Sequence, residues 1–284
     1  MPEIAEVETL RRDLEPVLVG RTIVDCVATG ERSVRRHEFL GELAALVCGA
    51  QVTGLRRVGK YLLIDAVGAT ATSDPLVIMI HLRMSGQVFH VDRSAPLAKH
   101  THVRIGLDGR DEIRFVDPRT FGEVFACRCA DFDRLVPSVA AMGWDPLASP
   151  VSKLAFGRQV ASVKRHAKAF LLDQRQVAGL GNIYTDEVLF AAKVRHDRWT
   201  NSLTPREVGR MYRAILALPA DAANNGGSSL RDQQYRRLYG EIGGHQHHLQ
   251  VFDRAGQPCF VCGRVIERAA YGGRSTFFCR HCQH

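Results

Sequence analysis

The chain has 284 residues, of which 45% are hydrophobic and 24% charged; this is the composition of an ordinary folded protein, and the length exceeds one typical domain. It has no apolar run that could cross a bilayer and no sign of a secretory leader, which argues against the membrane and secreted classes and predicts a cytoplasmic protein. The net charge of +8 favours a polyanionic partner.

The positive excess lies in two segments. Residues 153–175 hold six Lys or Arg against one Asp, and residues 250–284 hold five Arg against two acids, so that together they account for the whole net charge. A basic run is usually only a solvated surface. Positive charge concentrated in two separate modules is, however, suited to following a phosphate backbone.

The chain opens with MPEIAEVETLRRDL, whose apolar residues recur at helical spacing. Pro2 is expected at a first helical position, where the carboxylates of Glu3, Glu6 and Glu8 complement the helix dipole. An alternative is that Pro2 becomes a free amine once Met1 is removed and then acts as a nucleophile. The opening stretch does not decide between these interpretations.

Segments rich in Val, Ile and Phe follow, separated by Gly and Asp, and predict β-strands. They indicate a sheet-rich first domain over residues 1–134, either a two-layer sandwich or a flattened barrel. A proline-containing connection over residues 135–152 is the predicted linker. The predicted strand segments are residues 21–30, 50–67, 75–89, 101–107 and 111–129.

The pattern becomes helical over residues 153–232. Thr204, Pro205 and Glu207 are typical of a capped helix start. A polar, glycine-punctuated segment over residues 233–250 is then predicted to be a mobile loop.

A glycine-rich turn in VAGLGNIYTDEVLF lies between two helical segments, with Asn182 at the start of the second. Gly179 and Gly181 would let the backbone approach a phosphate closely, next to the unpaired N–H groups of a helix start. A tight helix connection would have the same sequence. The residues alone leave both interpretations open.

Four cysteines form two C-x-x-C pairs separated by sixteen residues: Cys259, Cys262, Cys279 and Cys282. Two such pairs can converge on one tetrahedral zinc ion, and four thiolates leave no open position for catalysis, so the predicted metal is one structural Zn²⁺. Residues 251–284 are therefore a predicted zinc finger. The remaining cysteines are expected in the core: Cys26, Cys48, Cys127 and Cys129.

Several stretches occur together in a distinctive order: MPEIAEVETLRR, GKYLL, HLRMSG, DPRTFG, LLDQRQVAGLGNIYTDEVLF and the four-cysteine finger. Over essentially the whole chain they resemble the formamidopyrimidine-DNA glycosylase and endonuclease VIII family. The resemblance implies an α+β multidomain fold, in which a β-sandwich with flanking helices precedes a helix-two-turn-helix domain, a loop that caps the damaged base at residues 233–250, and a zinc finger hairpin.

The resemblance also implies a function. It predicts a monomeric, nucleoid-associated base excision repair enzyme that acts on damaged double-stranded DNA as a glycosylase and as an abasic-site lyase. Pro2 would attack the C1′ carbon, Glu3 would protonate the sugar ring oxygen, and Glu6 would organise the amine. Lys60 matches the lysine assigned to β-elimination, and Arg274 matches the arginine linked to δ-elimination.

DNA contacts follow from the same resemblance. Three residues match those that fill the gap left by a flipped base, which favours the branch that removes oxidised purines: Met84, Arg119 and Phe121. Further residues fall on or near positions that hold phosphates or the complementary strand: His81, His100, Lys164, Lys168 and Asn182.

Two alternatives remain. An endonuclease VIII-type enzyme for oxidised pyrimidines is disfavoured by Met84 and Arg119, and a non-catalytic DNA-binding member is disfavoured by intact Pro2, Glu3 and Lys60.

The sequence departs from the family pattern at a few positions. Ala5 replaces a usual proline, Thr120 stands where a second arginine is common, and Trp144 interrupts a GPDPL-like stretch. None of these removes a catalytic group, but Thr120 is expected to weaken one phosphate contact. The segment 233–250 is also unusual, which leaves the lesion preference as the least constrained expectation.

Overall fold

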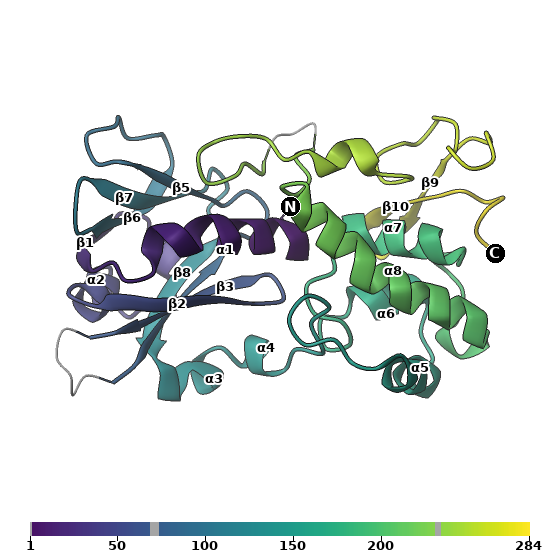
Figure 1. Ribbon diagram of the computed structural model, residues 1–284, viewed down its shortest axis with the longest axis horizontal. Helices are drawn as coiled ribbons and strands as arrows, with labels where there is room; N and C mark the ends of the chain where they lie inside the picture. Colours follow the sequence, from purple (N-terminus) through teal and green to yellow (C-terminus); the bar gives the residue numbers. More distant parts are fainter. Residues whose placement is uncertain (1, 69–73, 231–233) are drawn as a thin grey trace. The chain divides into compact units, whose positions relative to one another are not determined.

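The computed structural model describes residues 2–68, 74–230 and 234–284, and the chain divides into two compact units (Figure 1). One unit comprises Met1–Ala140 and Asn225–Gly244, and the other comprises Ala141–Asn224 and His245–His284. Among the described residues, none of the helices has the length and apolarity needed to span a membrane.

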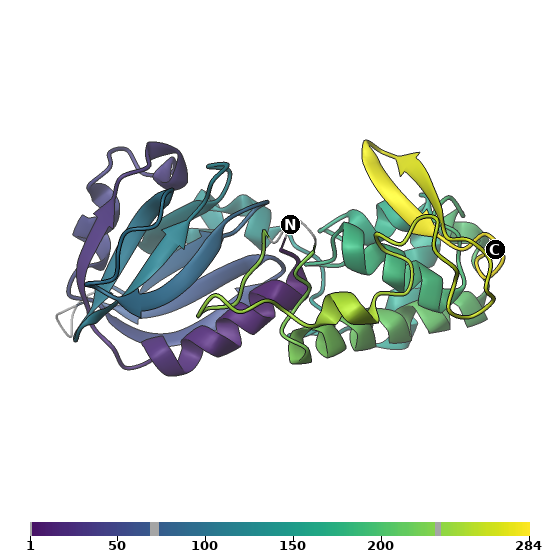
Figure 2. The same cartoon turned by 90° about the horizontal axis from the view of Figure 1, so that it is seen from above.

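The first unit contains two antiparallel sheets of four strands each, as the strand-rich segments predict (Figure 2). One sheet has the order β1-β6-β7-β5 and the other the order β2-β3-β4-β8. Their bounds are β1 Ile23–Ala28, β2 Gln51–Val58, β3 Tyr61–Val67, β4 Leu76–His81, β5 Gln87–Asp92, β6 Thr101–Leu107, β7 Asp111–Val116 and β8 Glu123–Arg128.

The core of this unit lies between the two sheets. Its apolar residues come from both, for example Ile105 and Phe115 on one sheet and Ile64 and Ile78 on the other. Helix α1 (Ile4–Leu18) packs against β2 and β3 and adds Leu10 to the same core (Figure 1). The predicted two-layer β-sandwich is therefore confirmed. The short helices of this unit are η1 Glu31–Val34, α2 Glu42–Val47, η2 Cys129–Asp131, α3 Phe132–Leu135 and α4 Pro137–Ala140.

The segment Asn225–Gly244, which we call the strap, returns to the sandwich from the distant helical part of the sequence. Leu238 of the strap is fully buried in the sandwich core. The Arg237 guanidinium makes an ion pair of 2.7 Å with Asp13 of α1. The chain thus passes from one unit to the other after Asn224 and back after Gly244. The predicted division at residue 232 lies outside the described residues and stays a prediction. The other predicted boundaries stay predictions.

The second unit is built around α7 (Asn182–Ala192). This helix contacts α6 (Ala167–Leu172), α8 (Pro205–Asn224) and the finger strand β10 (Arg274–Phe278). Helix α8 begins as predicted: the backbone N–H of Thr204 donates to Glu207 at 2.7 Å, and the Glu207 N–H donates to the Thr204 hydroxyl at 3.3 Å. The elements are α5 Lys153–Ser162, α6 Ala167–Leu172, α7 Asn182–Ala192, η3 Thr200–Ser202, α8 Pro205–Asn224, η4 His245–His248, β9 Glu267–Tyr271 and β10 Arg274–Phe278.

The four cysteines outside the finger do not all lie in the core. Cys26 and Cys127 are buried, and burial raises the pKa of Cys26 to about 12. Cys48, which follows the short helix α2, is exposed, and Cys129 is half-buried. The expectation of four core thiols is wrong for these two because each lies just beyond the end of a packed element.

Candidate active site and nucleic-acid interface

The start of α1 buries two carboxylates directly after Pro2. The helix begins at Ile4 and not at Pro2, because Glu3 has an extended backbone with φ −118° and ψ −164° and so precedes the first helical residue. The Glu3 N–H donates to the Glu6 carboxylate at 2.8 Å, and both Glu3 and Glu6 are 1% exposed. The expected helix start is thus shifted by two residues, and Pro2 lies immediately outside it.

Glu6 is held from a second direction by the strap. Its other carboxylate oxygen accepts the backbone N–H of Ser228 at 2.8 Å. The neighbouring Gly227 has φ +76°, and a Cβ there would lie 2.9 Å from the ring of Tyr235 and 3.1 Å from Glu6, so only glycine fits. Burial, followed by the Glu6 charge, raises the pKa of Tyr235. Sequence reasoning missed Ser228 and Tyr235 because both lie more than 200 positions from Glu6.

Lys60 lies in a two-residue turn between β2 and β3. The last strand pair before the turn is Val58 with Tyr61, and Gly59 adopts φ +57°, the left-handed region that favours glycine. Tyr61, directly after the turn, is buried, and Leu62 lies in the sandwich core, so the turn projects from a packed hairpin. Lys60 itself is half-buried.

His81 is opposite Tyr61 in the β3–β4 pairing, and their ring centroids are 4.2 Å apart. Burial and then the positive charges of Arg83, Lys60 and Arg35 hold the pKa of His81 well below its usual value. Its Nδ1 accepts the backbone N–H of Arg83 at 3.1 Å. A neutral His81 is suited to donating one hydrogen bond from Nε2, and not to pairing with a phosphate as a cation.

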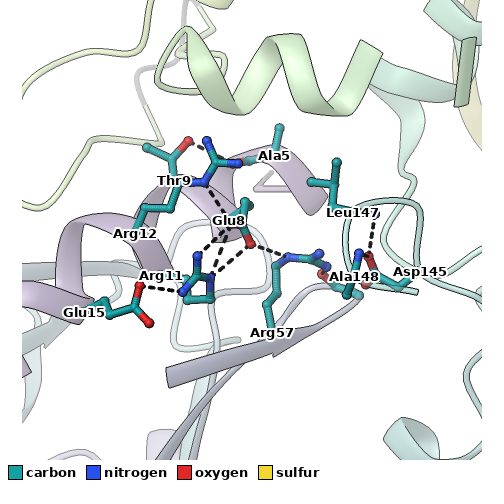
Figure 3. Close-up of polar contacts among 11 residues, drawn as sticks. Ala5, Glu8, Thr9, Arg11, Arg12, Glu15, Arg57, Asp145, Leu147 and Ala148 are labelled. Carbon is teal, nitrogen blue, oxygen red and sulfur yellow. Dashed lines mark hydrogen bonds and ion pairs between the residues drawn. The ribbon is translucent and has the colours of Figure 1, made fainter. Parts of the chain in front are cut away.

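Glu8 lies one turn beyond the helix start, and its carboxylate makes an ion pair of 3.1 Å with the guanidinium of Arg57 (Figure 3). Burial alone would raise the pKa of Glu8. Hydrogen bonds from Arg11 and Arg12, together with the charges of Arg11 and Arg57, lower that pKa below its usual value. Glu8 is therefore an ionised, largely buried carboxylate surrounded by guanidinium groups.

The residues predicted to fill the gap left by a flipped base lie on two loops. Met84 is on the β4–β5 loop, and Arg119 and Phe121 are on the β7–β8 loop. Met84 and Phe121 are each 39% exposed, and the Arg119 guanidinium lies 4.8 Å from the Phe121 ring centroid. Thr120 between them adopts φ +57°, a strained conformation for a β-branched residue.

Asp117 joins these two loops. It is fully buried, and one carboxylate oxygen accepts the hydroxyl of Ser85 at 2.5 Å while the other accepts the N–H of Gly122 at 2.7 Å. His100 lies beside it, since the Asp117 N–H donates to the His100 carbonyl at 3.0 Å. Sequence reasoning missed Asp117 and Ser85; the available signal was an acid in DPRTFG and a hydroxyl in HLRMSG.

In the second unit the four finger cysteines converge. Their sulfur atoms all lie within 4.8 Å of one another, with Sγ separations of 3.9 Å for Cys259 and Cys282 and 3.5 Å for Cys262 and Cys279. A tetrahedral site with Zn–S bonds of about 2.3 Å places sulfurs about 3.8 Å apart. The thiolates therefore fit one zinc ion as a closed, structural set.

The finger hairpin is fixed to α7 by a buried acid. The Asp186 carboxylate accepts the Thr276 hydroxyl at 2.8 Å and the Phe277 N–H at 2.9 Å. Lys168 donates to the same carboxylate at 2.7 Å and to the Ser275 carbonyl at 3.2 Å. Asn182 also donates to the Ser275 carbonyl, at 2.8 Å.

These contacts correct the expectation for Lys168. Its side chain is fully buried, so its ammonium holds the finger hairpin and is not available to a DNA phosphate. Asn182 lies at the start of α7 as predicted, but its amide is directed to the hairpin. Lys164 is exposed, with its ammonium 5.6 Å from the Trp199 ring centroid, and Arg274 is exposed at the start of β10.

A β-sandwich with a buried acidic helix start, a helical unit and a four-cysteine finger define a zinc-containing multidomain protein whose exposed basic residues suit nucleic acid. Three family descriptions match the chain in order. These are the formamidopyrimidine-DNA glycosylase N-terminal domain over residues 1–124, its H2TH domain over residues 142–234, and the zinc finger found in FPG and IleRS over residues 256–284. The chain belongs to the formamidopyrimidine-DNA glycosylase family, and its finger is a structural Zn²⁺ site.

Named relatives of the same family align with this chain over their full length. The chain is 34% identical to formamidopyrimidine-DNA glycosylase of Bacillus cereus, covering 100% of this chain and 99% of the relative, and 38% identical to that of Geobacillus kaustophilus, covering 100% of both. Among solved structures it is similar to the MutM (Fpg) protein of Thermus thermophilus, with TM-score 0.87, 38% identity and coverage of 99% and 98%. Lactococcus lactis Fpg bound to DNA containing N7-benzyl-Fapy-dG gives TM-score 0.88 at 32% identity, with 99% of each chain covered.

Proposed function

We propose that this protein excises oxidised purines, namely 8-oxoguanine and formamidopyrimidines, from duplex DNA and cleaves the resulting abasic site by β,δ-elimination. The main support is the start of α1, where Pro2 precedes the buried carboxylates of Glu3 and Glu6 in a chain of the formamidopyrimidine-DNA glycosylase family. The named relatives and the DNA-bound neighbours support the same activity.

Pro2 is the nucleophile once Met1 is removed. An α-amino group has a pKa of about 7.7–8.0, so an appreciable fraction is unprotonated near neutral pH, and a helix start favours the neutral form further. Attack on the C1′ carbon displaces the damaged base. A secondary amine then gives an iminium that stays cationic without losing a proton, and this cation is the electron sink for elimination.

Glu3 and Glu6 divide the acid–base work. Glu3 protonates the ring oxygen of the sugar as the ring opens. Glu6 is fixed by the N–H groups of Glu3 and Ser228, so it orients the amine of Pro2. Lys60 then serves β-elimination, and Arg274 serves δ-elimination from the finger hairpin.

The exposed residues account for DNA binding. Flipping a base out of the duplex costs a few kcal/mol, and Met84, Arg119 and Phe121 fill the gap that the base leaves. His100 and Lys164 bind the phosphate backbone. The enzyme works as a monomer in the cytoplasm, associated with the nucleoid.

The nucleophile assignment predicts a covalent adduct. Borohydride reduction during turnover on an oxidised-purine duplex is expected to trap a protein–DNA complex, with the DNA on the amino-terminal peptide, because the Pro2 iminium is reduced to a stable amine. Peptide mapping by mass spectrometry locates the link, and Lys60→Ala is the control that must still be trapped. A link on Lys60, or no adduct at all, would show that Pro2 is not the nucleophile.

Arg119 is expected to read the base opposite the lesion. Its guanidinium can donate two hydrogen bonds to O2 and N3 of an orphaned cytosine, whereas adenine presents a donor at N6. One such contact discriminates by about 1–3 kcal/mol. Arg119→Ala is therefore expected to reduce the preference for cytosine over adenine roughly ten- to a hundredfold, measured as single-turnover excision at fixed salt.

Lys164→Ala is the matched comparison. Removing the Lys164 ammonium from the phosphate backbone is expected to weaken binding to both duplexes about equally. If Arg119→Ala also slows both duplexes by one factor, Arg119 binds the backbone and does not read the opposite base.

A further inference from the structure

Lys60 can act on DNA only if the turn that carries it is held in one orientation. The turn has two residues, and its first, Gly59, has a left-handed backbone with φ +57°. Glycine has no Cβ to restrict its conformation, so this turn is not made rigid by its own sequence. The orientation of Lys60 must come from contacts made by neighbouring residues.

Arg57 makes such a contact. Its Nη1 donates to the carbonyl of Gly59 at 2.9 Å, which is the carbonyl of the peptide joining Gly59 to Lys60. Because a peptide group is planar, a hydrogen bond to that oxygen also fixes the direction of the Lys60 backbone N–H. The Arg57 side chain is only 2% exposed, so it is a packed element and not a mobile surface arginine.

The same guanidinium is anchored on α1. Arg57 Nε donates to Glu8 at 3.1 Å (Figure 3). Glu8 lies on α1, which Glu3 caps and whose first turn carries Glu6. Arg57 thus connects the Lys60 turn to the helix that begins beside Pro2.

We propose that Arg57 is a positioning residue for Lys60, holding the β2–β3 turn in register with the start of α1 through Glu8. This inference rests on the proposed role of Lys60 in β-elimination. Arg57 touches neither DNA nor a reacting atom in this role. It acts only by fixing the Gly59–Lys60 peptide.

The neighbouring Arg56 supplies a matched control. Successive strand residues point to opposite faces, and Arg56 points outward, where it makes an ion pair of 2.9 Å with Asp65. Its side chain is 47% exposed. Arg56→Met removes the same charge from the same strand without touching the Lys60 turn.

Arg57→Met leaves the Glu8 carboxylate with other positively charged partners. That carboxylate keeps its ion pairs with Arg11 at 3.0 Å and Arg12 at 2.9 Å, so it is not left unpaired. Arg57→Lys is the second variant, because lysine retains the charge but cannot reproduce two bonds donated from separate nitrogens of a planar group. Circular dichroism and thermal unfolding establish that each variant is folded, and if Arg57→Met is not, Arg57→Lys takes its place.

The test is a double-mutant cycle on a duplex with a preformed abasic site, which needs no base excision. Arg57→Met and Lys60→Ala are each expected to slow single-turnover strand cleavage on the order of tenfold to a hundredfold. The double variant is expected to be no slower than Lys60→Ala alone. Borohydride trapping is expected to be unchanged in Arg57→Met, and Arg56→Met is expected to match the wild type.

Other results overturn the inference. Arg57 does not act through Lys60 if Arg57→Met slows cleavage by the same factor in the wild-type protein and in the Lys60→Ala variant. The same conclusion follows if Arg57→Met does not slow cleavage at all. If the Arg57→Met variant is no longer trapped by borohydride, the substitution disturbs Pro2 at the start of α1 and not only Lys60. If Lys60→Ala itself cleaves at the wild-type rate, the proposed role of Lys60 fails, and the inference about Arg57 fails with it.

Discussion

Glu3→Gln is expected to lower base excision by roughly a hundred- to ten-thousandfold, which is the usual contribution of a positioned general acid. Glutamine has nearly the same shape as glutamate but cannot donate a carboxyl proton to the sugar ring oxygen. The backbone N–H of Glu3 is untouched and can still donate to Glu6 at 2.8 Å. The start of α1 is therefore expected to remain folded while excision is lost.

The measurement is single-turnover release of 8-oxoguanine opposite cytosine. Strand cleavage at a preformed abasic site is measured in parallel and is expected to be much less affected, because there the aldehyde form of the sugar already has an open ring. Glu15→Gln is the control, since Glu15 lies on the same helix with a side chain 49% exposed. Excision at the wild-type rate by Glu3→Gln would move the proton donor to another residue.

The strand segments and the start of α8 could be predicted because local patterns determine them, whereas α1 begins two residues later than expected. Val- and Ile-rich segments became the two sheets, and the Thr204–Glu207 pattern became a reciprocal cap at the start of α8. The finger could be predicted equally well, since metal geometry limits how two C-x-x-C pairs can meet. Each of these features depends on residues close together in sequence or on one metal ion.

Long-range packing could not be predicted in the same way. The strap joins the first unit because Leu238 packs in the sandwich core and Arg237 makes an ion pair with Asp13. In both cases the contacting residues are more than 100 positions away in the sequence. In the sequence, Lys168 is one of six basic residues in the segment 153–175, a pattern that predicts an exposed side chain. Its burial depends on Asp186 and on a finger carbonyl, neither of which the local sequence reveals.

The same limit applies to the candidate site. The motif residues Lys60, Met84 and Arg119 were identified from the sequence, but the groups that hold their loops were not. Asp117 and Arg57 are buried charged residues whose roles come from hydrogen bonds to backbone atoms of the loops. A sequence pattern marks residues of distinctive chemistry, whereas the orientation of a loop depends on contacts across the sandwich.

Cys279→Ser is expected to release the zinc and abolish duplex binding while the β-sandwich stays folded. Cys279 is fully buried, and its N–H is held by the Gln283 side chain at 2.9 Å. The apolar core of the finger is small, with Ile266 and Phe277 as its main buried side chains beside Phe190 of α7. Zinc binding contributes about 10–16 kcal/mol to comparable fingers, far more than such a core can supply.

Without zinc the hairpin that carries Arg274 loses its rigid support. The arginine side chains of the finger are then no longer held in fixed positions for binding DNA phosphates. Zinc content is measured by atomic emission and duplex affinity by fluorescence anisotropy at fixed salt, because binding to phosphates is strongly salt-dependent. Cys48→Ser, at an exposed cysteine of the first unit, is the matched control and should retain both zinc and affinity. A Cys279→Ser protein that lacks zinc yet binds the duplex as tightly as the wild type would show that the finger is dispensable for binding.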